Sequence, residues 1–146
     1  MKKIFMALLL VLTLGVATAC ADTYAHDASV LPAAAQQVLK KNFKAKVSVV
    51  KIDKDFGMVK DYEVVLNDGT EITFDSKGNW EEVEVGATMT VPAAFMPQPM
   101  RTYLNANFKG VNVVGLEKKR NGYEVKLVND IELEFDSAGN FLRYDD

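Results

Sequence analysis

The sequence predicts an α+β fold made of two tandem repeats, each with one helix followed by a four-stranded antiparallel meander. The first observation behind this is that residues 31–85 match residues 96–146 in the same order. The second is that each repeat opens with helical apolar spacing and continues with short alternating stretches separated by turn dipeptides. The 146 residues are 49% apolar and 25% charged, a composition that excludes a disordered or collagen-like chain.

Residues 1–21 are predicted to be a secretory signal peptide. Lys2 and Lys3 precede an apolar run from Ile4 to Val16, and small residues follow it. The run is too short for a convincing membrane span, and no second apolar stretch follows. Removing the two lysines from the 17 basic residues leaves 15 against 20 acidic ones, a net charge of −5. A chain with this negative net charge is not expected to attract nucleic acid or anionic lipid.

Cys20 is the only cysteine, and it has two alternative fates. Ala19-Cys20-Ala21 fits the A-x-A rule, so ordinary signal peptidase would remove Cys20 and leave Asp22 as the new N-terminus. Ala17-Thr18-Ala19-Cys20 also resembles a bacterial lipobox, although Ala17 stands where Leu, Val or Ile is usual. Cleavage there would leave a lipid anchor on Cys20. Neither outcome leaves a disulfide to stabilise the fold.

The mature chain is expected to begin with an N-terminal tail at residues 22–30. Repeat 1 then spans 31–85, a linker spans 86–95 and repeat 2 spans 96–146. Each repeat starts with a helix, because apolar residues recur at i, i+4, i+7 and i+8. These residues are Leu31, Ala35, Val38 and Leu39 in repeat 1, and Met96, Met100, Tyr103 and Leu104 in repeat 2.

Four strands are predicted after each helix, because apolar and polar residues alternate with the period of a half-buried sheet. Their connections are Asp68-Gly69, Gly78-Asn79, Asn121-Gly122 and Gly139-Asn140, which are turn dipeptides. The side facing the helices is expected to carry Val50, Ile52, Tyr62, Val64, Leu66, Ile72, Phe74 and their equivalents in repeat 2. The outward side is expected to carry Glu71, Thr73, Trp80, Glu82, Glu132, Glu134, Phe141 and Arg143.

Several short segments together resemble one known family. They are the Asn-Phe-Lys that ends each helix, the Tyr-Glu-Val strand, the Glu-x-x-Phe-Asp-x-x-Gly-Asn turn and the C-terminal Phe-Leu-Arg-Tyr-Asp-Asp. They are similar to those of the β-lactamase-inhibitor-like, PepSY-like periplasmic proteins of Bacteroides-type bacteria. The resemblance covers roughly residues 30–146, so that 31–146 would be a PepSY-like domain. It implies a fold similar to β-lactamase inhibitor proteins and a periplasmic or secreted location in a Gram-negative cell. It transfers no catalytic residues, and nothing here matches the residues with which such inhibitors fill a β-lactamase cleft.

No catalytic residue, metal site or cofactor is predicted. His26 is the only histidine, so no Ser–His–Asp, Cys–His or zinc arrangement can be assembled. Residues 75–79 and 136–140 have a superficial likeness to calcium loops. They lack the twelve-residue spacing of an EF-hand and are explained as hairpin turns in which an aspartate accepts hydrogen bonds from turn amides. We therefore expect the protein not to be an enzyme.

Trp80 and Phe141 are candidate binding residues, because they occupy equivalent positions after the Gly-Asn turns. Strict alternation places them on the outward side with Glu82 and Arg143. Aromatic side chains in such a place either anchor a partner, cover the end of the sheet or pack between the repeats.

A loop in repeat 1, residues 55–61, is three residues longer than its counterpart in repeat 2 and contains Phe56 and Met58. Either these side chains recognise a partner, or Phe56 folds back onto the sheet. The leading hypothesis is a non-enzymatic envelope protein that binds another protein or peptide, as an inhibitor would. The alternative is a small-ligand or ion-binding envelope sensor that uses the acidic outward side.

Overall fold

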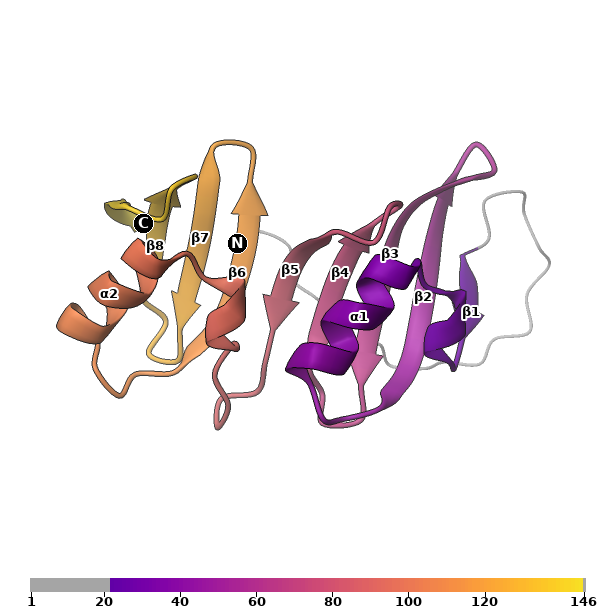
Figure 1. Ribbon diagram of the computed structural model, residues 1–146, viewed down its shortest axis with the longest axis horizontal. Coiled ribbons are helices and arrows are strands. Elements are labelled where there is room, and N and C mark those ends of the chain that lie inside the picture. The colour runs from indigo at the N-terminus through magenta and orange to yellow at the C-terminus, as the bar shows by residue number, and fades with distance from the viewer. Residues whose placement is uncertain (1–21, 146) are drawn as a thin grey trace.

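The computed structural model describes residues 22–145, whose strands form one antiparallel sheet in the order β1 to β9 (Figure 1). The predicted signal peptide, residues 1–21, and Cys20 within it lie outside the described residues. Within the described part of the chain, no helix is long and apolar enough to cross a membrane.

Both repeats contain the predicted helix and four consecutive strands. Each strand is hydrogen-bonded to the one before it in the chain, so each repeat is a meander and the two meanders share one sheet. Repeat 1 contains α1 (Ala33–Asn42), β2 (Val47–Asp55), β3 (Met58–Leu66), β4 (Glu71–Asp75) and β5 (Trp80–Glu84). Repeat 2 contains α2 (Gln98–Asn107), β6 (Val113–Lys119), β7 (Gly122–Leu127), β8 (Glu132–Asp136) and β9 (Phe141–Asp145).

The N-terminal segment is not the tail that the sequence predicts. It forms a ninth strand, β1 (Thr23–Ala25), and a short 3-10 helix, η1 (Ala28–Val30). Thr23 lies opposite Ile52, so β1 covers the outer edge of β2. A three-residue strand held by backbone hydrogen bonds is too short for alternation to reveal it.

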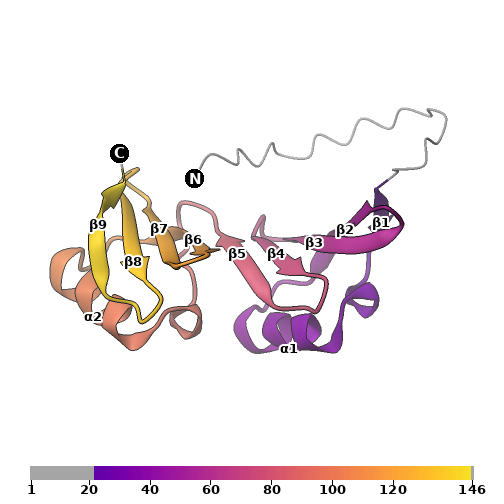
Figure 2. The same cartoon turned by 90° about the horizontal axis from the view of Figure 1, so that it is seen from above.

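Both helices lie on the same side of the sheet and leave the other side uncovered (Figure 2). The predicted inward side chains of repeat 1 are confirmed as buried, except Ile52, which is half-buried. The helices contribute equivalent residues to this core, Ala35 and Leu39 from α1 and Met100 and Leu104 from α2.

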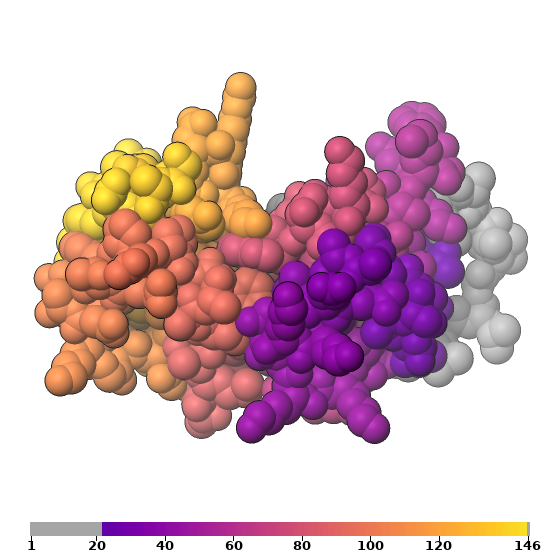
Figure 3. All heavy atoms as spheres, in the orientation of Figure 1, coloured from indigo at the N-terminus to yellow at the C-terminus, as the bar shows by residue number. Residues whose placement is uncertain are grey.

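The predicted linker, residues 86–95, joins the repeats through a second 3-10 helix, η2 (Ala93–Phe95). Phe95 is only 5% exposed, and its ring lies 5.1 Å from that of Trp80 and 5.8 Å from that of Phe43. The salmon atoms after β5 accordingly meet the indigo atoms of α1 in Figure 3. Phe95 therefore closes repeat 1 and makes the two cores continuous.

The two Asp-Ser-x-Gly-Asn segments are hairpin turns, as predicted. Asp75 Oδ1 accepts hydrogen bonds from the backbone N–H groups of Lys77 and Asn79, each at 2.9 Å, and Asp136 does the same in repeat 2. A Cβ on Gly78 would lie 2.9 Å from both Ala35 N and Pro32 Cβ. Glycine is therefore needed both for the positive φ of the turn and for the close approach of α1.

Candidate functional site

Trp80 does not lie on the outward side of the sheet. Thr73 is opposite Glu82, and Phe74 is opposite Trp80, so one extra residue of β5 forms a bulge between the two pairs. Because paired residues on adjacent strands share a face, Trp80 lies on the helix side with Phe74. Glu82 is outward, as predicted. The bulge also keeps Val83 inward, where it is fully buried.

Phe141 is turned inward in the same way. Glu134 is opposite Arg143 and Phe135 is opposite Phe141, with the bulge at the same place in β9. The ring of Phe141 stacks on Tyr103 of α2 at 4.3 Å with an angle of 7° between the planes. Arg143 remains outward, as predicted, and its Nε donates to Glu134 Oε2 at 2.8 Å.

Phe56 and Met58 form an exposed apolar tip on the β2–β3 hairpin, which projects at the upper right of Figure 1. Phe56 is 97% exposed and Met58 is 75% exposed. The alternative in which Phe56 folds back onto the sheet is therefore wrong. Phe56 also has a φ of 49°, a left-handed conformation that costs about 1–2 kcal/mol for a residue other than glycine. Phe56 and Gly57, whose φ is 77°, are the two residues between the paired Asp55 and Met58, so the positive φ of Phe56 belongs to a tight hairpin turn. Packing within the repeat does not explain the exposure of its ring.

The outward side of the sheet is a ladder of charged residues. Burial raises the pKa of Glu71, and the nearby carboxylates of Glu84 and Glu63 raise it further. Burial also raises the pKa of Glu84. One row of opposed residues crosses both repeats and consists of Lys51, Glu63, Thr73, Glu82, Glu117, Glu124, Glu134 and Arg143.

Three carboxylates meet at the C-terminal end of this side. One oxygen each from Glu124, Glu132 and Asp145 lies within 4.8 Å of the others, close enough to ligate one cation together. Lys119 Nζ is 3.0 Å from Glu124 Oε2 and already supplies a positive charge there. The sequence did not reveal this group because its members are on three strands, and only the register of β7, β8 and β9 brings them together.

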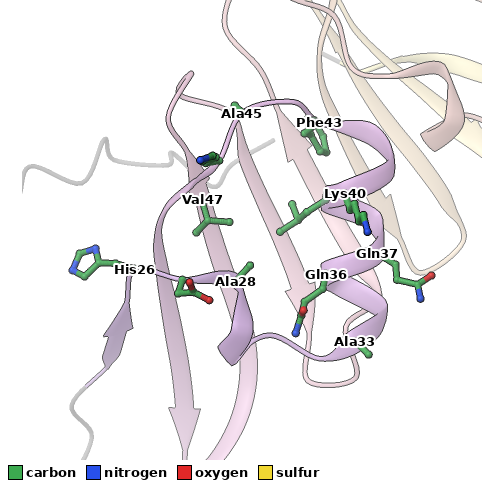
Figure 4. Close-up of a pocket in the computed structure, with 12 residues that line it drawn as sticks. His26, Ala28, Ala33, Gln36, Gln37, Lys40, Phe43, Ala45 and Val47 are labelled. Carbon is green, nitrogen blue, oxygen red and sulfur yellow. The ribbon is translucent and has the colours of Figure 1, made fainter.

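A groove of about 690 Å³ lies between α1 and the N-terminal segment (Figure 4). His26 lies at its rim, where its Nδ1 is 3.1 Å from the carbonyl oxygen of Ser48. Gln36 lines the groove, but its Nε2 donates to the carbonyl of Leu31 at 2.8 Å. The fold therefore already uses the side-chain polar groups of His26 and Gln36.

Known proteins share the duplicated architecture. A family model described as "Putative beta-lactamase-inhibitor-like, PepSY-like" matches residues 17–64 and, a second time, residues 60–143. A "putative periplasmic protein of unknown function" from Bacteroides vulgatus ATCC 8482 is 40% identical, with a TM-score of 0.79 over 86% of this chain and 100% of that one. A "putative calcium-regulated periplasmic protein" from Bacteroides thetaiotaomicron is 36% identical, with a TM-score of 0.77 over 86% of this chain and 97% of that one. No curated protein matches the chain.

Proposed function

The chain belongs to the β-lactamase-inhibitor-like, PepSY-like family, and from this we propose that it is a non-enzymatic periplasmic protein that binds another protein through the β2–β3 hairpin tip. The observation that carries the proposal is the exposure of Phe56 and Met58 at that tip. The location is supported by the predicted signal peptide and by the periplasmic descriptions of both relatives.

The tip is suited to binding because two paired strands, β2 and β3, carry its apolar surface away from the rest of the sheet. Burying a phenylalanine or methionine side chain is worth about 1.5–3 kcal/mol each, and hot spots of protein interfaces are built from a few such anchors. Repeat 2 lacks the feature, since β6 and β7 turn through Arg120 and Asn121 and have seven and six residues against nine in β2 and β3. The longer hairpin is therefore specific to one end of a duplicated molecule.

The experiment compares affinity capture from an envelope extract by the exported protein and by the double variant Phe56→Ser/Met58→Ser. We expect the variant to lose the captured partner, with at least a tenfold drop in affinity, and to keep its melting temperature because both side chains are exposed. Val128→Ser is the matched control, because Val128 is also an exposed apolar residue, at 41%, but lies outside the tip. Equal capture by all three proteins would refute the proposal.

The second candidate function is that of an ion-binding envelope sensor. It is favoured by the carboxylate group of Glu124, Glu132 and Asp145 and by the description of the Bacteroides thetaiotaomicron relative as calcium-regulated. Calcium that binds only the folded protein would raise its stability by RT ln(1 + [L]/Kd). We expect CaCl2 to raise the melting temperature, Glu132→Gln to remove the effect and Asp55→Asn to leave it unchanged. The absence of any rise in millimolar calcium would remove this candidate.

A further inference from the structure

The junction between the repeats shows what covers the last strand of a repeat. Strand β6 adds to the free side of β5, with Leu116 opposite Val83 and Glu117 opposite Glu82. Next in β6 is Lys118, whose Nζ lies 3.9 Å from the centre of the Trp80 ring.

Phe95 meets the same ring edge-on at 5.1 Å. The cover of repeat 1 thus consists of an antiparallel strand, a cation over the indole and an aromatic ring from η2.

Repeat 2 presents the same surface without that cover. Strand β9 is equivalent to β5, and within residues 22–145 it is hydrogen-bonded only to β8. Phe141 takes the place of Trp80, with Tyr103 stacked on it and Tyr144 edge-on at 5.5 Å. Tyr144 is 54% exposed and Leu142 is 56% exposed. A groove of about 510 Å³ between α2 and the start of β9 is lined by Tyr103 and Phe141 and opens beside these rings.

We propose that β9 and the aromatic cluster of Tyr103, Phe141 and Tyr144 bind an extended segment of a partner protein, which adds an antiparallel strand to the sheet. An unpaired edge supplies main-chain hydrogen bonds, and the neighbouring side chains supply specificity, as in other cases of strand addition. This site is separate from the β2–β3 hairpin tip and does not depend on it, because the two lie at opposite ends of the sheet order.

The β5–β6 junction also indicates the chemistry of that segment. Arg143 replaces Glu82, and its Nε is bound to Glu134. The other N–H groups of its guanidinium can donate to an acidic partner residue in the place of Glu117. The residue opposite Tyr144 takes the place of Leu116 and is a large aliphatic one. The next residue along takes the place of Lys118 and is a cation over the Phe141 ring. The segment therefore reads aliphatic, acidic, basic, as in Leu116-Glu117-Lys118.

A second copy of this chain fits the edge less well. In a second copy, the strand equivalent to β6 is β2 of repeat 1, which would have to add to β9. The outer edge of β2 is already paired with β1. Two β9 strands that overlap fully around a two-fold axis would place Arg143 opposite its own copy, and like charges directly opposite destabilise a strand pair. A foreign strand with an acidic residue at that position avoids both conflicts.

The test uses a synthetic peptide with the sequence of residues 111–119, titrated into the 15N-labelled exported protein. We expect amide shifts concentrated in β9 and around Tyr103, and about tenfold weaker binding by Tyr144→Ala, whose side chain is mostly exposed. Tyr24→Ala is the matched control, because Tyr24 is also an exposed tyrosine, at 47%, but lies in β1 at the other end of the sheet order. It should bind the peptide as tightly as the unchanged protein.

A second peptide, N-methylated at alternate backbone positions, should not bind, and this result does not depend on the folding of any variant. The proposal is overturned if millimolar peptide shifts no β9 amide, or if the methylated peptide binds equally. It is also overturned if sedimentation shows a dimer that Tyr144→Ala dissociates, because the occupant of the edge would then be a second copy.

Discussion

Replacing Phe95 with alanine removes the side chain that joins the two repeats. Phe95 is 5% exposed and contacts the rings of Trp80 and Phe43. Truncating a buried phenylalanine costs about 3–5 kcal/mol, and the lost ring contacts favour the upper half of that range, so we expect a loss of about 4 kcal/mol. For a domain of this size, such a loss lowers the melting temperature by about 15 °C.

Urea unfolding followed by two signals measures this loss. Trp80 is the only tryptophan and lies at the junction, so its fluorescence reports the junction, whereas far-UV circular dichroism reports the whole sheet. The two transitions should coincide in the unchanged protein, as they do when a domain unfolds in one step. Val30→Ala is the matched control, because Val30 has the equivalent position in η1 but is 39% exposed. It should cost less than about 1 kcal/mol.

Two results would refute this reasoning. One is a loss of less than about 1 kcal/mol in Phe95→Ala, which would mean that the repeats do not depend on this contact. The other is a separation of the two transitions in the unchanged protein, which would mean that each repeat unfolds alone.

Three further predictions concern the turns and the outward side. Hydrogen bonds from Asn140 lower the pKa of Asp136, so its carboxylate stabilises the folded protein above the pKa of the unfolded chain. This stability is lost as pH falls through the lowered pKa. Asp136→Asn should therefore reduce the fall in melting temperature at acid pH. Burial raises the pKa of Glu71, so the stability that comes from its protonation is present at low pH and is lost as pH rises through the raised pKa. Glu71→Gln should therefore melt at a higher temperature at pH 7, and its melting temperature should depend less on pH. A Cβ on Gly122 would collide with the carbonyl oxygen of Phe135, so Gly122→Ala should lose about 3 kcal/mol in urea unfolding.

The repeat, both helices and eight of the strands could be predicted because local signals determine them. Self-matching located the repeats, helical spacing located α1 and α2, and turn dipeptides located the hairpins. The face of Trp80 could not be found by alternation, because a bulge changes the count within β5. A signal was present in hindsight, since Trp80 and Val83, like Phe141 and Tyr144, are large apolar residues three apart, a spacing that a regular strand does not give.

The features that depend on distant contacts were not accessible from the sequence. Residues 86–95 have the composition of a linker, and the role of Phe95 follows only from its contacts with the rings of Trp80 and Phe43. The carboxylate group of Glu124, Glu132 and Asp145 depends on the register of three strands. In contrast, the longer loop with Phe56 and Met58 could be located, because a loop longer in one repeat than in the other is a local feature. The sequence left open whether Phe56 folds back onto the sheet, and its exposure excludes that alternative.

The central claim is that the β2–β3 hairpin tip contacts a protein partner, and photo-crosslinking in intact cells tests it most directly. A benzophenone amino acid is placed at residue 56, and in a separate protein at residue 128, which is also exposed. The account predicts that light produces a discrete crosslinked adduct from residue 56 and none from residue 128, and that Met58→Ser weakens the adduct. No adduct from residue 56, or the same adducts from both positions, would contradict it.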